Sequence, residues 1–367
     1  MDIDNTNNIE LEELRKKINI IDEKILNLLN ERGECVQKIG NLKKLLDINV
    51  FQPSRELEII ERIKTKSSIL GPSSIEAIWK EILSASKLLQ GFINRVGFLG
   101  PVGTFTHQAA LEYFPKAGTE FKTFTTILDI FENIEKGVIE YGVIPIENNL
   151  QGTVRETLDL LIERNLFIYG ELELRIIHNL ISLNNSDLLK INKIISHVQA
   201  FAQTKKWIRK HLPNAKLINA NSTAEAVQKV RELNDESYAA IGTEFSSKPN
   251  ELKILRSRIE DSSLNYTRFL IISQKENIHK EGLIKTSIVF VTKHIPGALY
   301  SVLQIFAEND INLLKIESRP RRNGRWEYIF LMDFEGDKMD QKVINVLDKM
   351  VENVIWFKIL GSYPLMR

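Results

Sequence analysis

Two cations, Arg32 and Lys43, interrupt an apolar stripe in the N-terminal part of the chain. Apolar residues recur there every three or four positions, as they do on one face of a helix: Leu14, Ile18, Ile21, Ile25, Leu28, Val36, Ile39 and Leu46. At about 100° per residue, Arg32 points where the stripe points, and Lys43 returns to nearly the same face eleven positions later. A buried charge without a partner costs several kcal/mol. The two cations therefore either reach solvent at the edge of the stripe, pair with a carboxylate such as Glu56, or hold an anionic ligand.

Further polar groups stand where helices or strands are expected to end. Ser86 and Gln90 are four residues apart, so a helix places them on one face. After residue 94, polar side chains follow expected strands in GPVGTFTHQAA, PIENN, SHVQAFAQ and NYTRF. A glycine-rich turn that opens a helix can bind an anion through backbone N–H groups. An ordinary strand-to-helix turn has the same sequence pattern, so these segments taken singly leave both interpretations open.

Arg32, Lys43, Ser86 and Gln90 are expected to be positioned by three helices, over about 9–46, 53–66 and 72–90. Pro72 stands near the first helical position of the third. We expect the first eight residues to be disordered. Gly33 and Gly40 each weaken the long helix locally by about 1 kcal/mol relative to alanine. A helix of about ten turns followed by two shorter ones cannot close into a compact bundle alone. The sequence therefore predicts a homodimer.

Strands and helices alternate from Asn94 to about residue 275. Strands are expected at RVGFL, EFKTF, YGVIPIE, KINKIISH, AKLINA, YAAIG and TRFLIIS. Helices are expected after the first glycine-rich turn, from Thr125, through TVRETLDLLIERN, through HVQAFAQTKKWIRKHL and from Ser222. This order predicts a parallel-rich α/β architecture in two lobes, with ligands at the carboxyl ends of strands.

A third unit follows the charged linker QKENIHKEG. It reads strand (TSIVFVTKH), helix (GALYSVLQIFAEN), strand (INLLKIESRP), strand (WEYIFLMDFEG), helix and a last strand near VIWFKIL. That βαββαβ order is the ferredoxin-like split motif. Three units of different class on one chain suggest catalysis coupled to regulation.

Composition restricts the classes of function. The 367 residues carry a net charge of +1 and are 43% hydrophobic, which argues against nucleic acid as the main partner. No apolar run approaches the roughly 18 residues of a membrane span, and MDIDNTNNIE has no secretory pattern. The single cysteine, Cys35, excludes an intramolecular disulfide and disfavours a cysteine metal cluster. We expect a cytoplasmic protein with no metal and no organic cofactor.

Residues 9–92 resemble the all-helical chorismate mutases, on the segments LRKKINIIDEKILNLLNER, IGNLKK, PSRE and SASKLLQ. The resemblance implies an all-α mutase domain over 1–92. It implies that Arg32, with Arg15 of a partner subunit, binds the two carboxylates of chorismate. Its remaining site residues would be Lys43 and Gln90 beside the ether oxygen, Glu56 and Gln52 at the ring hydroxyl, and Ser86 and Arg55 in the wall.

The implied reaction suits these residue types. A Claisen rearrangement needs no obligatory proton transfer, and it is helped by cations placed where negative charge grows on the ether oxygen. Gln52 departs from the aspartate of many relatives. Its amide can still bond a hydroxyl, so we expect altered rather than lost activity.

Residues 95–275 resemble prephenate dehydratase, on GTFTH, PIENNLQGTV, SHVQAFAQ, NSTAEA and TRF. The resemblance implies a two-lobed, periplasmic-binding-protein-like domain over 94–275. Dehydration needs a proton donor to the departing hydroxyl, and the resemblance gives Thr267 that role or its support. It assigns the rest of the cleft to Arg268, Phe269, Glu147, Asn148, Ser196, Gln203 and Thr104.

Two histidines and two departures complete this region. His107 and His197 could act as acid or base, but we expect structural hydrogen bonds from both. Asn149 and Val198 replace the hydroxyl residue and the proline that relatives often carry. Both substitutions are expected to be peripheral.

Residues 285–367 resemble the ACT domains attached to prephenate dehydratases, on GALYSVL and KIESRP. The resemblance implies a phenylalanine site between two such domains. The site would be formed by Gly297, Ala298 and Leu299 and by Glu317, Ser318, Arg319 and Pro320. Without the resemblance, Gly297 is expected only to cap a helix and Arg319 to be a surface charge.

The three resemblances occur in the order of the bifunctional chorismate mutase/prephenate dehydratases, which implies chorismate, prephenate and phenylalanine as ligands of a homo-oligomer. Dimer and tetramer remain open. Two alternatives are a non-catalytic phenylalanine-sensing protein and a dehydratase with a regulatory helical domain. The presence of Arg15, Arg32, Lys43, Glu56, Gln90 and Thr267 argues against the sensor.

Overall fold

The computed structural model describes residues 2–46, 53–66, 69–90, 93–116, 118–278, 282–320 and 328–365. The chain divides into two compact units, the first built mainly from residues 1–93 and the second from Asn94 onward. Within the described ranges, no helix combines the length and the apolar character needed to cross a bilayer.

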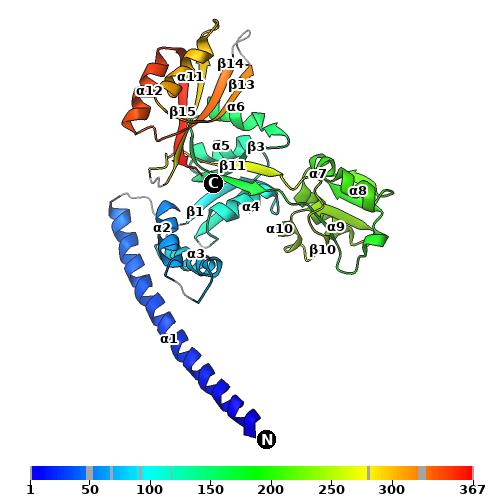
Figure 1. Cartoon of the computed structure of the whole chain (residues 1–367). Coiled ribbons are helices and arrows are strands. Elements are labelled where there is room, and N and C mark those ends of the chain that lie inside the picture. Colours follow the sequence, from blue (N-terminus) through cyan, green and yellow to red (C-terminus); the bar gives the residue numbers. More distant parts are fainter. Residues whose placement is uncertain are drawn as a thin grey trace. The chain divides into compact units, whose positions relative to one another are not determined.

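The N-terminal unit consists of three helices, α1 (Asp2–Leu45), α2 (Pro53–Lys64) and α3 (Pro72–Leu89) (Figure 1). The expectation that the first eight residues are disordered was wrong, because α1 begins at Asp2. Each residue added to an existing helix gains a backbone hydrogen bond. Pro72 is the first residue of α3, as predicted, and Gly71 precedes it as the N-cap.

Helix α1 contains 44 residues, which corresponds to about 66 Å at 1.5 Å per residue. Its apolar stripe is largely uncovered within one chain: Ile18 is 56% exposed, Ile21 53% and Ile25 49%. Two glycines of α1 lie against the C-terminal end of α3. A Cβ on Gly40 would lie 2.8 Å from Gln90 Cγ, and one on Gly33 would lie 3.2 Å from Leu89 Cδ1. The glycines that weaken α1 as a helix therefore allow α3 to approach it closely.

The first lobe of the second unit, called lobe A, is a sheet in the order β2 (Thr119–Phe124), β1 (Asn94–Leu99), β3 (Tyr141–Asn148), β11 (Tyr266–Ser273) and β5 (Phe167–Arg175). The short β4 (Gly152–Thr153) pairs with β3. Its helices are α4 (Phe105–Tyr113), α5 (Ile127–Glu135) and α6 (Arg155–Glu163). Strand β1 runs parallel to β3, whereas β11 is antiparallel to both β3 and β5.

The second lobe, lobe B, is a sheet in the order β10 (Lys253–Arg256), β6 (Asn179–Ser182), β9 (Tyr238–Gly242), β7 (Lys193–Ser196) and β8 (Lys216–Asn219). Its helices are η1 (Leu188–Lys190), α7 (Val198–Gln203), α8 (Lys205–His211), α9 (Thr223–Leu233) and α10 (Glu244–Ser247). The single helix expected across 197–212 is broken at Thr204, whose hydroxyl donates to Ala200 O at 2.7 Å.

The expectation of parallel-rich sheets was wrong for both lobes, which are mixed. The chain leaves lobe A after β5, forms lobe B, and returns to lobe A as β11. A strand that returns from another lobe is not constrained by a right-handed βαβ crossover, so it can enter antiparallel to its neighbours.

The C-terminal domain has the predicted βαββαβ order: β12 (Ile284–Thr292), α11 (Ala298–Glu308), β13 (Leu313–Pro320), β14 (Tyr328–Glu335), α12 (Gln341–Val351) and β15 (Val354–Pro364). Its sheet order is β13-β14-β12-β15. One apolar core is shared with lobe A, since Val289, Leu331 and Leu360 of this sheet cluster with Ile144 and Leu270. The C-terminal sheet is therefore packed on the same sheet that carries β11.

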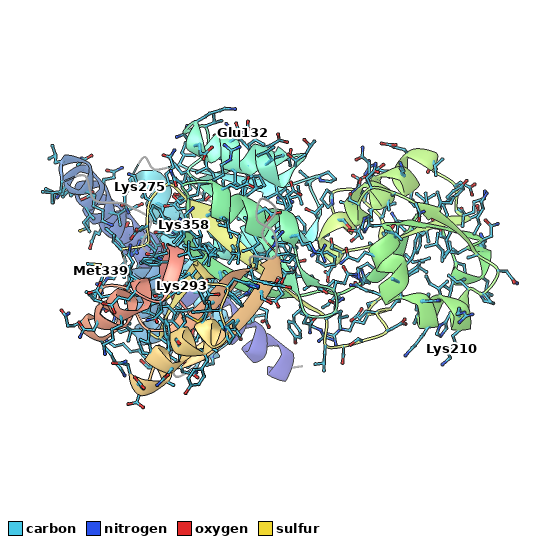
Figure 2. All side chains as sticks on the ribbon, turned by 90° about the horizontal axis from the view of Figure 1, so that it is seen from above. Glu132, Lys210, Lys275, Lys293, Met339 and Lys358 are labelled. Carbon is cyan, nitrogen blue, oxygen red and sulfur yellow. The ribbon has the colours of Figure 1, made fainter. Side chains whose placement is uncertain are left out.

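Charged side chains of the second unit lie on the surface in some places and in the interior in others. Lys210 on α8 and Glu132 on α5 stand on the outside of their helices (Figure 2). Lys358 of β15, in contrast, points inward and donates to the carbonyl oxygens of Leu161 at 2.9 Å and Arg164. A cation at the end of α6 compensates the negative end of the helix dipole. Its burial lowers the pKa of the Lys358 ammonium group.

Candidate active sites

Helices α1 and α3 bring Arg32 and Ser86 together in the N-terminal unit. Arg32 Nη1 donates to Ser86 Oγ, and Ser86 Oγ donates to Ile82 O at 2.6 Å. The serine thus holds one guanidinium nitrogen, while the rest of the guanidinium remains available for a ligand. Burial lowers the pKa of Arg32, because the charged form is poorly solvated there.

A second polar group lies around Glu56 of α2. Lys87 of α3 forms an ion pair with Glu56, and the Lys87 side chain is only 7% exposed. Burial raises the pKa of Glu56, opposed by the charges of Lys87 and Lys43. Burial likewise lowers the pKa of Lys43, opposed by the charge of Glu56. Of the interpretations left open for Lys43, proximity to Glu56 is confirmed, and an anionic ligand is not tested.

The other predicted residues of this unit are dispersed or not described. Gln90 Nε2 donates to Ser86 O at 3.4 Å, so Gln90 lies beside the serine that contacts Arg32. Arg15 pairs with Glu12 at 2.9 Å and is exposed; along α1 it lies about 25 Å from Arg32. Arg55 pairs with Glu58 on the surface, and Gln52 lies outside the described residues. One chain therefore forms two groups, Arg32 with Ser86 and Gln90 and Lys43 with Glu56, and the contacts of Arg15 and Arg55 lie in neither.

In the second unit, pairing of β3 with β11 sorts the predicted residues into two groups. Thr267 lies opposite Asn148, and Arg268 lies opposite Glu147. Because successive side chains of a strand point to opposite faces, these two pairs leave the sheet on opposite sides. We call the side of Thr267 the front face and the side of Arg268 the back face.

On the front face, Asn148 determines the direction of the Thr267 hydroxyl. Asn148 Oδ1 accepts from Leu150 N at 3.1 Å, so its Nδ2 must face the other way. Nδ2 donates to Thr267 Oγ1 at 2.9 Å. Because Thr267 Oγ1 is used as an acceptor there, its own hydrogen is free to be donated elsewhere.

The hydrogen bonds continue from lobe A into lobe B. Asn148 Nδ2 also donates to Asn265 Oδ1 at 2.9 Å, and Asn265 Nδ2 donates to Gln203 Oε1 at 3.0 Å. The same oxygen lies 2.7 Å from His178 Nε2. A cavity of about 280 Å³ lies beside this set, lined by Leu150, Gln151, Ala202, Gln203, Glu260, Asp261, Ser262 and Asn265. We call His178, Gln203, Asn265, Asn148 and Thr267 the amide chain.

Three predicted residues are used for structure. Ser196 is fully buried and its Oγ donates to Ile241 O at 2.9 Å. Thr104 caps α4, accepting from His107 N at 3.3 Å and donating to Leu99 O at 3.0 Å. Phe269 is 2% exposed and belongs to the interior. Hydrogen bonds in the described part of the chain do not join these three to Thr267.

The structural roles expected of the two histidines are confirmed. His107 Nδ1 accepts from Gly103 N at 3.2 Å, and its ring stacks on Phe98 at 4.3 Å. Burial lowers the pKa of His107. His197 caps α7 by accepting from Gln199 N at 3.3 Å.

Asn149 is exposed, as expected of a peripheral residue, yet its side chain bonds to the backbone of another segment. Its Nδ2 donates to Leu264 O at 2.7 Å and its Oδ1 accepts from Tyr266 N at 2.9 Å. Asn149 therefore holds the backbone on both sides of Asn265. Val198 is 62% exposed, in agreement with a peripheral position.

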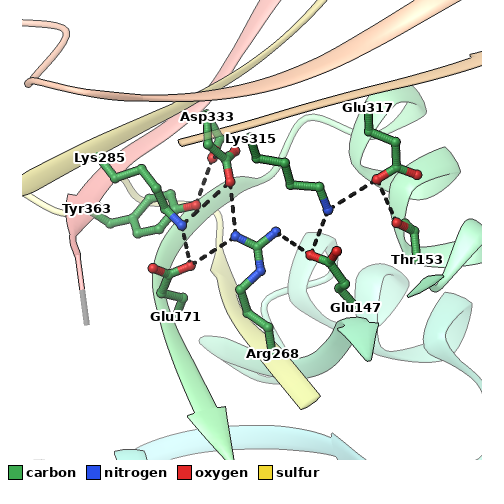
Figure 3. A network of polar contacts seen from close by, with 10 residues as sticks. Glu147, Thr153, Glu171, Arg268, Lys285, Lys315, Glu317, Asp333 and Tyr363 are labelled. Carbon is green, nitrogen blue, oxygen red and sulfur yellow. Dashed lines mark hydrogen bonds and ion pairs between the residues drawn. The ribbon is translucent and has the colours of Figure 1, made fainter. Parts of the chain in front are cut away.

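On the back face, Arg268 enters a buried charge cluster shared with the C-terminal domain (Figure 3). Its guanidinium contacts Asp333 at 3.0 Å, Glu147 at 3.1 Å and Glu171 at 3.5 Å. Lys285 of β12 bridges Glu171 and Asp333. Burial alone would raise the pKa of Asp333, but the charges of Lys285 and Arg268 hold it below its ordinary value.

Lys315 of β13 extends this back-face cluster by contacting Glu147 at 2.7 Å and Glu317 at 3.1 Å. Thr153 donates to Glu317 at 2.6 Å. Arg268 and Glu147 were expected in the cleft with Thr267; the structure instead places their charges among these residues, on the other side of the sheet. Their role in the cleft stays a prediction.

The two segments expected to bind an amino acid lie at one edge of the C-terminal sheet. Strands β12 and β13 are both antiparallel to β14, so they run parallel to each other and their carboxyl ends share that edge. Gly297, with φ of 85°, caps α11 directly after β12, and 317–320 close β13. Arg319 is not a free surface charge, since it pairs with Asp159 at 2.8 Å.

Comparisons with known proteins agree with this division. Family models match residues 14–91 (Chorismate mutase type II), 96–277 (Prephenate dehydratase) and 286–352 (ACT domain). A "Bifunctional chorismate mutase/prephenate dehydratase" of Aquifex aeolicus is 40% identical over 360 residues, which cover 97% of this chain and 98% of that protein. The chain belongs to the bifunctional chorismate mutase/prephenate dehydratase family.

Solved structures resemble the dehydratase and ACT domains. A prephenate dehydratase from Arthrobacter aurescens in complex with L-Phe is 30% identical with a TM-score of 0.68, covering 74% of this chain and 90% of that chain. GqqA, described as a quorum quenching acylase, is 28% identical with a TM-score of 0.67, covering 74% and 98%. Proteins of similar fold are thus described with two different activities, so the activity must be argued from the site.

Three polar residues of the mutase and dehydratase domains were not singled out from the sequence: Lys87, His178 and Asn265. Lys87 directly follows Ser86 in the mutase segment SASKLLQ, and Asn265 stands in NYTRF, so both had a local signal. His178 lies between β5 and β6, outside every segment that carried the family resemblance. Among the described residues, groups of three or more His, Cys, Asp or Glu suited to a metal ion are absent.

Proposed function

We propose that the chain converts chorismate to prephenate in its helical domain and prephenate to phenylpyruvate in its two-lobed domain, under control by phenylalanine at the ACT domain. The observation that carries the proposal is the Asn148–Thr267 hydrogen bond, which leaves the Thr267 hydroxyl as a donor in a domain that matches prephenate dehydratases. Family membership over the whole length supports the joint assignment.

The mutase reaction fits the residues around Arg32. The rearrangement breaks a C–O bond and forms a C–C bond within one molecule, so it requires a held conformer and cations but no proton transfer. Arg32, steadied by Ser86, would bind a carboxylate. Lys43 would face the ether oxygen, and Glu56 would orient the ring hydroxyl while keeping Lys43 and Lys87 in place.

The dehydratase reaction needs a proton at one oxygen. As the ring C–O bond of prephenate breaks, the C–C bond to the ring carboxylate also breaks, and its electron pair completes the aromatic ring. Carbon dioxide leaves, and the departing hydroxyl becomes water when it receives a proton. Thr267 would relay that proton and recover one from solvent, with Gln203 and Asn148 as substrate-binding or supporting groups beside the cavity.

We further propose that the protein works as a homo-oligomer in the cytoplasm. The uncovered stripe of α1 would pair with a second copy, and that copy would supply Arg15, which is remote from Arg32 within one chain. The exposed, unpaired Cys35 suits a reducing compartment. Phenylalanine would bind at the sheet edge formed by Gly297–Leu299 and residues 317–320, and inhibition requires that it bind one conformation better than another.

The test follows both reactions in one sample. The purified chain is incubated with chorismate, and chorismate loss and phenylpyruvate formation are recorded with and without phenylalanine; prephenate is supplied separately to isolate the second step. Both signals and their suppression by phenylalanine are expected. Chorismate consumed without phenylpyruvate, even when prephenate is added, would refute the two-step function.

Matched variants then assign each step to its site. Thr267→Val keeps the side-chain shape but has no hydroxyl, and Thr267→Ser keeps the hydroxyl. The valine variant should lose only dehydratase activity, and the serine variant should retain a measurable part of it. Lys43→Met should nearly abolish mutase turnover without lowering stability.

A further inference from the structure

His178 is a buried residue of the dehydratase domain that the proposed reaction does not use. It lies between β5 and β6, where the chain passes from lobe A to lobe B, and it is 2% exposed. Its backbone N–H donates to Glu260 Oε2 at 3.1 Å, and Phe105 meets its ring edge to face at 5.7 Å. The imidazole is thus buried against Phe105 with Nε2 directed at Gln203 Oε1, and its Nδ1 has no hydrogen-bond partner among the described residues.

The hydrogen-bond direction of the amide chain can be read from one backbone group. Leu150 N–H fixes Asn148 Oδ1, so Asn148 donates to Asn265 Oδ1. Asn265 must then present its Nδ2 to Gln203, and Gln203 must accept with Oε1. An acceptor at that position requires a donor from His178, so the imidazole carries its hydrogen on Nε2.

We propose that His178 is a positioning residue of the dehydratase, which locks the amide of Gln203 and, through Asn265 and Asn148, the donor direction of the Thr267 hydroxyl. This inference rests on the proposed dehydratase function. Leu150 N–H sets the direction at the lobe A end of the amide chain, and His178 Nε2–H sets it at the lobe B end.

The arrangement has a chemical consequence at Gln203. With Oε1 bonded to both Asn265 and His178, Gln203 Nε2 stays a donor, and it has no hydrogen-bond partner among the described residues. Gln203 also lines the cavity, so its amide can donate to an oxygen of prephenate. Without the His178 donor, the Gln203 amide can turn over, which opposes the donor of Asn265 and weakens the order that reaches Thr267.

A near-isosteric pair of variants tests the inference. His178→Gln places an amide N–H close to the position of Nε2, whereas His178→Met has similar length and no donor. The Met variant should lose at least tenfold in dehydratase kcat with less than a threefold change in KM for prephenate, and the Gln variant should stay within threefold of the parent in both. Mutase turnover of the same chains serves as the internal standard for folded protein.

Equal kcat in the Met and Gln variants, or a loss that lies in KM alone, would overturn the inference. Asn265→Asp provides the second measurement, since it keeps the acceptor for Asn148 and removes the donor to Gln203. It should lower kcat in the same way. The double variant His178→Met/Asn265→Asp should lose no more of the dehydratase kcat than the more impaired of the two single variants, because both substitutions act through one chain of bonds. A kcat loss in the double variant equal to the product of the two single losses would also overturn the inference. Absence of parental activity on prephenate would instead refute the proposed function.

Discussion

The two faces of β11 carry polar clusters built from different chemistry. Behind the strand, Arg268 and Lys285 meet Asp333 and Glu171, four charged groups that balance in sign. On the front face, Thr267 is linked by hydrogen bonds to amide side chains and one imidazole, and none of these groups needs to be charged. A buried charge is costly when its partner is missing, whereas a neutral chain has a direction that can be reversed. The back should therefore govern stability, and the front should govern reactivity.

Location strengthens this contrast. Asp333 and Lys285 belong to the ACT domain and are each 3% exposed as side chains, between two sheets that share one apolar core. The amide chain instead borders a cavity and links the two lobes of the dehydratase domain. One strand thus separates an interdomain contact from a candidate reaction site.

The largest expected effect is on the back face. Asp333→Asn keeps the shape but leaves Arg268 and Lys285 with one carboxylate fewer, so the free energy of unfolding should fall by about 3–5 kcal/mol. Chemical denaturation of the dehydratase–ACT unit measures it. Glu132→Gln is the matched control, because Glu132 forms a surface pair with Lys136 at 3.0 Å and should cost less than about 1 kcal/mol.

Adding Lys285→Met to Asp333→Asn sharpens the test. Removal of the excess cation should restore part of the lost stability, since a neutral buried site avoids the uncompensated charge. If Asp333→Asn costs no more than Glu132→Gln, the back-face cluster is not a determinant of stability, and the contrast between the faces fails.

The front face should respond in rate. Asn148→Asp is isosteric, but it replaces the donor at Thr267 with an acceptor, so the Thr267 hydrogen turns toward the carboxylate. Dehydratase kcat should fall about 100-fold, equivalent to about 2.7 kcal/mol in the barrier, with mutase turnover unchanged. Steady-state kinetics on prephenate measures it. A rate within threefold of the parent would mean that the direction of this hydrogen bond is irrelevant.

The residue motif TRF illustrates what can be predicted from the sequence. The motif placed Thr267 and Arg268 in the same candidate site, and only the β3·β11 register reveals that they leave the sheet on opposite faces. One partner of Arg268, Asp333, lies 65 residues away along the chain, in another domain. Adjacent positions in a motif can therefore be required for different reasons, which depend on tertiary contacts.

Other omissions have equally local causes. Gly33 and Gly40 were interpreted as weak points of a helix because close approach of α3 is invisible along α1. Strand β5 was not predicted, although residues 171–175 alternate charged and apolar side chains; the structure buries even Glu171 of that alternation. The order of domains and most elements could be predicted because hydrophobic period and turn residues are properties of the segment itself.

The two clusters should also differ in pH range, which gives the smallest effect. Burial lowers the pKa of both His107 and His178 from 6.5, so below about pH 6.5 the unfolded chain binds more protons than the fold. Stability that is present above that pKa is lost as pH falls through the lowered folded value. The cost should be on the order of 1 kcal/mol, or about 2–4 °C in Tm. The charges of Lys285 and Arg268 lower the pKa of Asp333 against the effect of its burial, so Asp333 titrates only in more acidic solution. Thermal unfolding between about pH 7.5 and 5 should therefore have a flatter slope in His178→Gln, whose amide does not titrate and can still donate to Gln203, and an unchanged slope in Asp333→Asn. The opposite pattern would assign acid sensitivity to the carboxylates and remove this distinction between the clusters.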